Sequence, residues 1–312
     1  MNATFAAPAK LNLFLHVIGR RADGYHLLES VFQLVDFGDV ITVAVRPDGQ
    51  ILRLNQVVGV PAESDLAVRA ARLLQQTCGI TAGADLTLEK RIPLGAGLGG
   101  GSSDAATVML ALNRLWNLDL PRSRLMELGL ALGADVPFFL FGRNAFASGV
   151  GERLAVAALP ALWFVVLKPQ VSIPTHEIFG QPDLTRNAKS VKMLDFSAAA
   201  RFGAEKLVGC SDASGAGGDG AGAIFFPEPV FRNDLQPVAA RMYPEVGKTL
   251  AWLAHAGQDA LIGARMTGSG SCVFAGFGNR NAAESVFAQR PPDIGGFVAS
   301  GLECHPLIDF AH

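Results

Sequence analysis

The spacing of apolar residues near the start of the chain is that of a β-strand. Apolar and polar side chains alternate in residues 8–17, and a period of two predicts a strand with one buried face. The expected buried face carries Leu11, Leu13, Leu15 and Val17, and the other face carries Lys10, Asn12, Phe14 and His16. The Asp23-Gly24 pair predicts a turn. Residues 30–45 predict two further strands with a break at residues 37–39.

Helical periods dominate the rest of the first half. They predict helices over residues 65–78, 103–116 and 122–132, and a short helix or turn after residue 134. Strands are expected over residues 86–94, 146–149 and 163–168. Because the two kinds of element mix without a regular βαβ alternation, the sequence predicts an α+β fold rather than a doubly wound parallel sheet.

The pattern changes after about residue 173. Helices are expected over residues 185–194 and 242–256, and extended segments over residues 272–277 and 296–300. We therefore expect two domains, residues 1–160 and residues 161–312, with a boundary near residues 155–170.

One stretch of the second half is unsuited to a core. Residues 209–222 consist mainly of Gly, Ala, Ser and Asp, a composition that predicts a flexible surface loop. We interpret residues 201–225, which contain it, as a flexible insertion.

Composition excludes several classes of protein. The 312 residues are 50% hydrophobic and 17% charged, with a formal net charge of −2. Such a chain can bury a large core, so it is not intrinsically disordered. Its near-neutral charge also argues against a broad electrostatic grip on nucleic acid. The four cysteines form no CxxC pair, so neither a zinc site nor a disulfide framework is predicted.

Neither a leader nor a membrane segment is expected. The first residues lack the basic start and the apolar run of a signal peptide. The longest apolar run, Leu154 to Leu167, is interrupted by Pro160 and is shorter than the roughly 18 residues that a membrane span needs. We expect a cytoplasmic protein with reduced thiols.

The strongest chemical signal is the glycine-rich stretch from Pro93 to Ser103. Glycine lets backbone N–H groups approach an anion closely, and the start of the following helix adds free N–H groups and a positive dipole end. Ser102 and Ser103 add hydroxyl groups. The stretch therefore predicts a phosphate-binding loop; the alternative, a tightly packed loop, would bear the entropy cost of so much glycine without a function.

Two better-known phosphate loops fit less well. No Gly-Lys-Ser/Thr sequence ends the stretch, so it is not a Walker A loop. Gly95, Gly97 and Gly100 do satisfy the GxGxxG pattern of dinucleotide-binding proteins, and Asp119 follows about 20 residues later. However, the strand that leads into the stretch carries charged residues at positions 89–91, unlike a strand buried on both faces. A dinucleotide-dependent oxidoreductase remains the weaker alternative.

Three smaller features have two interpretations each. Lys10 and Asn12 lie on the non-apolar face of the first strand, where they could serve a site or belong to a solvated edge. Asp135, within Gly133–Pro137, could be a catalytic carboxylate or a helix N-cap. Residues 268–271, Gly-Ser-Gly-Ser, could approach a ligand or form an ordinary turn.

Together these motifs resemble the GHMP small-molecule kinases. The resemblance rests on Pro8-Ala9-Lys10-Leu11-Asn12, the glycine-rich stretch, Gly133-Ala134-Asp135-Val136-Pro137-Phe138 and Thr267-Gly268-Ser269-Gly270, and it covers nearly the whole chain. It implies a fold of two α+β domains with the active site in the cleft between them. It also implies that Asp135 is the catalytic base or orients the attacking hydroxyl, with Lys10 as its charge partner.

The same resemblance implies the cofactors. ATP would be bound by Pro93, Leu94, Gly95, Ala96, Gly97, Leu98, Gly99, Gly100, Gly101, Ser102 and Ser103. Mg²⁺ would accompany ATP, because a divalent ion offsets phosphate charge. No acidic cluster in the sequence predicts a protein metal site.

Two further motifs resemble one branch of the family. Asp23-Gly24-Tyr25-His26 and Ser172-Ile173-Pro174-Thr175 are similar to motifs of members that phosphorylate a cytidyl diphosphate sugar alcohol in non-mevalonate isoprenoid synthesis. The resemblance implies a substrate site in which Tyr25 and Phe179 stack on cytosine, His26 bonds its edge, and Thr175 and Asn12 lie nearby. Core packing is the other interpretation of the aromatic residues.

Other functions stay open at this point. Another GHMP kinase would act on mevalonate, homoserine or a sugar, and an RNA-binding module is disfavoured by the neutral charge and the lack of an aromatic and basic stripe. We expect a small-molecule substrate, without a nucleic-acid or membrane partner. The sequence leaves the oligomeric state undetermined.

Overall fold

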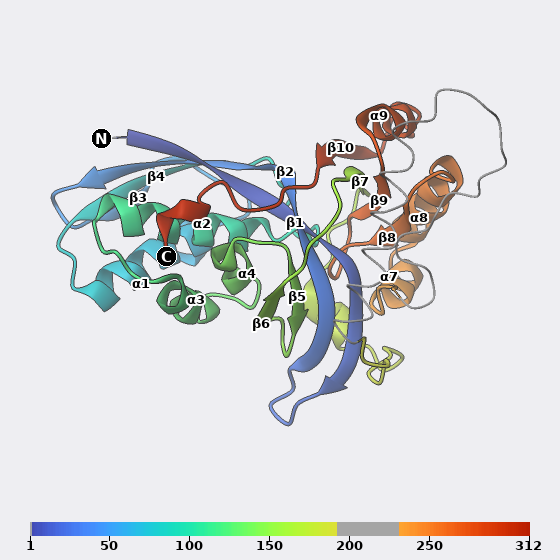
Figure 1. Ribbon diagram of the computed structural model, residues 1–312, viewed down its shortest axis with the longest axis horizontal. Coiled ribbons are helices and arrows are strands. Elements are labelled where there is room, and N and C mark those ends of the chain that lie inside the picture. The colour runs from blue at the N-terminus through green and yellow to red at the C-terminus, as the bar shows by residue number, and fades with distance from the viewer. Residues whose placement is uncertain (1, 192–230) are drawn as a thin grey trace.

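The computed structural model describes residues 2–191 and 231–312. Their strands form a six-stranded sheet of order β3-β4-β2-β5-β6, in which β1 also pairs with β2, and a four-stranded sheet of order β10-β7-β9-β8 (Figure 1). The strands are β1 (Asn2–Arg20), β2 (His26–Arg46), β3 (Ile51–Arg53), β4 (Gly83–Glu89), β5 (Ala145–Ser148), β6 (Arg153–Val156), β7 (Trp163–Lys168), β8 (Ile262–Met266), β9 (Val273–Phe277) and β10 (Gly295–Ser300).

The helices form two groups, one beside each sheet. Helices α1 to α4 accompany the larger sheet, and α7 to α9 accompany the smaller one (Figure 1). Their bounds are α1 (Leu66–Cys78), α2 (Gly100–Leu115), α3 (Arg122–Leu130), α4 (Val136–Phe141), α5 (Thr175–Phe179), α7 (Gln236–Met242), α8 (Pro244–Ala256) and α9 (Arg280–Ala288). Short 3₁₀ turns span Ala62–Ser64 and Ile308–Phe310. The expected α+β fold is confirmed.

The long antiparallel pair β1 and β2 runs through the middle of the molecule (Figure 1). The expectation of one buried face for the first strand is wrong, because residues of the second half cover the other face. Lys10 and His16 are each only 3% exposed. The expected break at residues 37–39 is also wrong: β2 continues through it, with a register shift opposite Pro8 and Ala9. Gly38 fits there because a Cβ would lie 2.2 Å from the carbonyl oxygen of Ala7.

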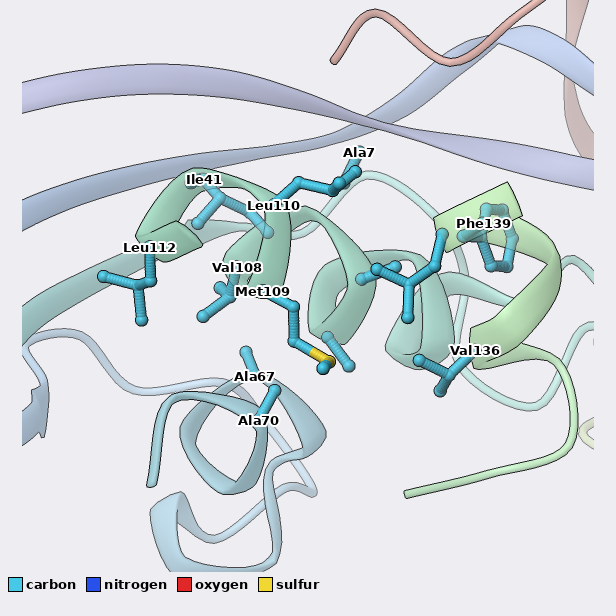
Figure 2. Close-up of a cluster of buried hydrophobic side chains, with 14 of the residues drawn as sticks. Ala7, Ile41, Ala67, Ala70, Val108, Met109, Leu110, Leu112, Val136 and Phe139 are labelled. Carbon is cyan, nitrogen blue, oxygen red and sulfur yellow. The ribbon is translucent and has the colours of Figure 1, made fainter. Parts of the chain in front are cut away.

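Helix α2 forms the centre of the first core. Its residues from 103 to 113 are all buried, as expected of a helix that is covered on every side. Figure 2 shows Met109 between α2 and the alanines Ala67 and Ala70 of α1. Helix α1 begins where Asp65 accepts a hydrogen bond from the N–H of Ala67, and a glycine in the left-handed conformation ends it.

The other predicted elements mostly lie where the sequence places them, with two corrections. The strand expected over residues 86–94 ends at Glu89, because the N–H groups of Arg91 and Ile92 donate to the carboxylate of Asp39 instead of to a neighbouring strand. Residues 185–191 of the helix expected over residues 185–194 are not helical. The predicted loop at 209–222 and the insertion at 201–225 lie outside the described residues.

Two other predictions concern larger features. The domain boundary near residues 155–170 stays a prediction.

Within residues 2–191 and 231–312, no helix has the length and apolar character needed to cross a bilayer.

The last residues of the chain return to the first core. After β10 the chain runs back toward α2, and the end marked C lies beside the first helix group (Figure 1). The N–H of His305 donates to the carbonyl of Gly142 at 2.8 Å, and Leu307 and Ala311 are buried in the first core. Arg122 donates to the carbonyls of Leu140, Ile308 and Ala311.

His305 makes this attachment sensitive to pH. Its ring is fully buried, and burial, with a smaller contribution from Arg122, lowers its pKa to about 3. The unfolded chain therefore takes up a proton at His305 below about pH 6.5, whereas the folded chain does not. This histidine alone should lower the free energy of unfolding by about 2 kcal/mol between pH 7 and pH 5.

Urea unfolding at pH 7 and pH 5 measures this effect. Between pH 7 and pH 5 the free energy of unfolding of H305Q should fall by about 2 kcal/mol less than that of the native chain. H255Q, in which the replaced ring is exposed on α8, serves as the control and should follow the native chain. Equal losses for H305Q and the native chain would contradict the prediction.

Candidate active site

One cavity of about 780 Å³ collects the residues that the motifs singled out. It is lined by the glycine-rich loop, the middle of β1, the turn before β2, α5 and residues 268–270. Among the predicted site residues, the lining includes Lys10, Asn12, Tyr25, His26, Pro93, Leu94, Gly95, Ala96, Gly97, Leu98, Gly99, Gly100, Gly101, Ser102, Asp135, Thr175 and Phe179. Residues that lie more than 250 positions apart in the sequence thus share one site.

Ser103 is the predicted site residue that does not line the cavity. Its side chain is fully buried, and its hydroxyl donates to the carbonyl of Pro8 at 2.7 Å. This bond ties the first turn of α2 to β1.

The glycines of the loop are required by close contacts between backbone segments. Gly97 has a φ of +76°, and a Cβ there would lie 2.2 Å from the carbonyl oxygen of Thr267. The bonds that anchor the loop use its carbonyl groups: the N–H of Lys10 donates to Leu98, and the N–H of Cys272 donates to Ala96. In the first turn of α2 the N–H of Ser103 donates to the carbonyl of Gly99 at 2.9 Å, so an anion would be met by the N–H groups that precede Ser103.

Lys10 and Asp135 lie next to each other in the lining of the cavity. The Lys10 Nζ lies 3.6 Å from an oxygen of Asp135, with the lysine side chain 4% exposed and the aspartate 36% exposed. Lys10 also donates to Asn12 at 2.5 Å, and Asn12 in turn donates to Ser30 at 2.8 Å. A buried chain of hydrogen bonds therefore fixes the position of the ammonium group, while the carboxylate stays open to a ligand.

The structure does not support the N-cap interpretation of Asp135. The residue precedes α4 in the N-cap position, but its side chain makes no capping hydrogen bond. Pro137 lies in the first turn of the helix and has no N–H to be capped. The helix therefore does not use the carboxylate, and Asp135 lines the cavity.

Two of the expected nucleobase residues lie close together in the lining. The rings of His26 and Phe179 are 4.8 Å apart and inclined by 34°. Tyr25 is 64% exposed, and within the described residues its ring contacts no other aromatic ring. Thr175 shares a hydrogen bond of 2.8 Å with Ser269, which joins α5 to the Gly-Ser-Gly-Ser turn.

Sequence reasoning missed a charged cluster next to the glycine-rich loop, formed by Asp39, Lys90 and Asp104. Lys90, which also lines the cavity, donates to both Asp39 and Asp104. Burial raises the pKa of Asp104 to about 8; Lys90 acts against this shift, and the charge on Asp39 adds to it. The cluster joins β2, the end of β4 and α2. It therefore holds the strand end before the loop against the helix after it. The charged residues at positions 89–91 were the sequence signal that could have indicated this cluster.

Arg186 was also missed, because nothing in its sequence context marks it. Its Nε donates to the Nε2 of His26 at 3.1 Å. Burial, followed by the charges of Arg186 and Arg20, lowers the pKa of His26. The imidazole is therefore neutral at pH 7.

The chain matches known families over both halves. Residues 65–143 match the GHMP kinases N terminal domain, and residues 226–291 match the GHMP kinases C terminal model. A 4-diphosphocytidyl-2-C-methyl-D-erythritol kinase of Thiobacillus denitrificans is 52% identical over 310 residues, which cover 99% of each chain. A protein of the same name from Ralstonia nicotianae is 52% identical over 98% of this chain and 96% of its own length.

Solved structures agree with these sequence matches. A crystal structure of 4-(cytidine 5'-diphospho)-2C-methyl-D-erythritol kinase is 34% identical, with a TM-score of 0.72, and the match covers 96% of this chain and 100% of the other. A homoserine kinase from Cytophaga hutchinsonii is 19% identical, with a TM-score of 0.65 and coverage of 98% and 95%, and shows the same fold. The chain therefore belongs to the GHMP kinases and, within them, to the family of the 4-diphosphocytidyl-2-C-methyl-D-erythritol kinases.

Proposed function

We propose that this chain transfers the γ-phosphoryl group of ATP to the 2-hydroxyl of 4-diphosphocytidyl-2-C-methyl-D-erythritol. One observation carries the proposal: a single cavity is lined by the glycine-rich loop, the Lys10–Asp135 pair and the neighbouring rings of His26 and Phe179. The relatives at 52% identity carry the name of this activity. The names of these relatives thus agree with the function inferred from the cavity.

Phosphoryl transfer requires positioning and charge stabilisation more than covalent chemistry. The N–H groups of the loop would bind the phosphates of ATP. Asp135 would accept the proton of the attacking hydroxyl, or orient that hydroxyl, as the bond to the γ-phosphorus forms. Lys10, fixed by Asn12, would stabilise charge on the reacting oxygens.

Mg²⁺ would enter bound to ATP. The described residues hold no group of three or more His, Cys, Asp or Glu side chains that could bind a metal ion. Phosphate oxygens would therefore supply most of its ligands, and the hydroxyl of Ser102 in the cavity would be the protein ligand. The ion would offset the negative charge of the phosphates.

The nucleobase would be held by the ring side chains of the lining. Phe179 and Tyr25 offer ring faces, which bind any base, and His26 offers a polar atom to the edge of the base. Thr175 and Asn12 line the same cavity.

Other GHMP activities have weaker support. The homoserine kinase is 19% identical and a mevalonate kinase 13%, so these likenesses show the fold alone. We further propose a cytoplasmic location, which fits the free thiols of Cys78, Cys272 and Cys304; the fourth cysteine, Cys210, lies outside the described residues.

A substrate panel tests the proposed function. Purified protein is incubated with Mg²⁺-ATP and, separately, with the cytidyl substrate, mevalonate, homoserine and galactose, and ADP release is followed. We expect turnover with the cytidyl substrate alone. Turnover with one of the other alcohols and none with the cytidyl substrate would overturn the proposal.

Substitution of Tyr25 tests the nucleobase site. Because its ring is 64% exposed, Y25A removes a stacking face without opening the core. Base stacking is worth about 1–3 kcal/mol, so the KM for the cytidyl substrate should rise roughly 5- to 150-fold while the KM for ATP stays unchanged. L130A, at an exposed position on α3 outside the cavity, is the control. An equal rise in both KM values would count against the assignment.

A further inference from the structure

The guanidinium group of Arg186 joins the ring of His26 to the backbone of Phe179. Its Nε donates to the ring of His26 at 3.1 Å, and its Nη2 donates to the carbonyls of Phe179 at 3.1 Å and Gln181 at 2.7 Å. Its Nη1 donates to the carbonyl of Leu184 at 3.1 Å. The fork of fixed donors thus connects the end of α5 to the first residue of β2.

The backbone that carries Arg186 is itself attached to β1 and β2. The N–H of Ala188 donates to the carbonyl of Val17 at 3.1 Å. The buried carboxylate of Glu29 accepts from Ser190 at 2.5 Å and from the N–H of Val191 at 2.7 Å. These long-range bonds replace the helix that the sequence predicts for this segment, and they hold the guanidinium against His26.

The hydrogen bond to His26 decides which ring nitrogen carries the proton. An arginine donates and never accepts, so the Nε2 of His26 must accept and cannot carry a hydrogen. In a neutral imidazole the proton then lies on Nδ1. The ring consequently offers a hydrogen-bond donor, and not an acceptor, to a ligand at Nδ1.

We propose that Arg186 is a positioning residue that holds His26 in the Nδ1–H tautomer and thereby makes the site selective for cytosine. This inference rests on the proposed function, since it assumes that a cytidyl group lies against His26. At N3 cytosine presents an acceptor, which matches an N–H donor, whereas uracil presents an N–H group there, which does not. O2 is an acceptor in both bases, so the discrimination depends on N3. Selectivity of this kind arises because a mismatched polar group is left unpaired in the site.

The tautomer can be observed directly in the protein without substrate. In ¹⁵N-histidine-labelled native protein at pH 7.5, long-range ¹H–¹⁵N correlation spectra distinguish the two nitrogens, and the signals that disappear in H26Q identify the ring. We expect the Nδ1–H form in the native protein and its loss or mixing in R186M. An Nε2–H form in the native protein would overturn the proposal, whether or not R186M folds.

Kinetics test the consequence for selectivity. In R186M the KM for the cytidyl substrate should rise about tenfold, and the preference over the uridyl analogue should fall by a similar factor. The KM for ATP should not change. R241M is the matched control, because Arg241 is exposed and contacts Asp183 and Gln181 of the same segment without reaching His26.

The outcomes separate this inference from the function on which it rests. A native enzyme that uses the cytidyl substrate, with an R186M enzyme of unchanged KM and selectivity, overturns the role of Arg186 alone. A native enzyme that does not use the cytidyl substrate overturns the proposed function. An R241M enzyme that loses as much selectivity as R186M would show a merely structural effect of the segment and would also overturn the proposal.

Discussion

D135N is expected to lower kcat by about 10²–10⁴, because the variant loses the carboxylate that would take up or orient the proton of the attacking hydroxyl. The asparagine has the size of the aspartate, so the shape of the cavity is kept. The helix α4 should also form normally, since the native side chain makes no capping bond. We propose that ATP binds at the glycine-rich loop, so the KM for ATP should change little. Steady-state kinetics with both substrates measure the two effects separately.

The matched control is D183N. Asp183 is also an ion-paired aspartate, bonded to Arg241 at 3.0 Å, but it does not line the cavity. Its replacement should leave kcat unchanged. A D135N enzyme with a normal kcat and a weakened affinity for ATP would contradict the catalytic role and assign the carboxylate to nucleotide binding.

G97A is expected to reduce kcat/KM for ATP by about 100-fold or more, because the loop must move to accept the methyl group. The new Cβ would lie 2.2 Å from the carbonyl oxygen of Thr267, which belongs to the backbone and cannot rotate away. A shift of about 1 Å in a group that positions a substrate can cost about 10²-fold in rate. Kinetics at varied ATP concentration, with calorimetric binding of ATP, measure the effect.

G79A separates the clash from ordinary backbone strain. Gly79 has a similar positive φ of +63°, at the end of α1, but a Cβ there would meet nothing within 4 Å. G79A should therefore lose only about 1–2 kcal/mol of stability from the left-handed conformation and keep its ATP kinetics. If G97A and G79A behaved alike in ATP kinetics, the glycine loop would not be the phosphate site.

Features that depend on local sequence could be predicted. The period and the capping residues of α1 mark its bounds, and Asp65 and Gly79 lie at its two ends. The glycine motif predicts that the loop backbone approaches an anion, and this stays a prediction; the structure shows a different close contact, between Gly97 and the backbone of Thr267. The motif does not name the partner, because the residue that approaches lies 170 positions away.

Features that depend on distant residues could not be predicted. The alternation in β1 correctly shows a strand, but its second face is covered by segments such as residues 233–234 and Thr267. The N–H of Asn12 donates to Thr267 across 255 positions. Nor could the sequence show that Arg186 reaches His26, since the period of its segment favours a helix and bonds to β1 and β2 prevent one. Local preference gives way where such long-range bonds are available.

The return of the final segment to the first core has a consequence for synthesis on the ribosome. Domains ordinarily fold in the order in which they emerge. Here Leu307 and Ala311 complete the core around α2, and Arg122 finds two of its carbonyl partners at residues 308 and 311. The part of the chain translated first must therefore wait for residues 305–311 to leave the exit tunnel before it can reach its final packing. In the cell, that interval is when nascent chains would be most open to chaperones.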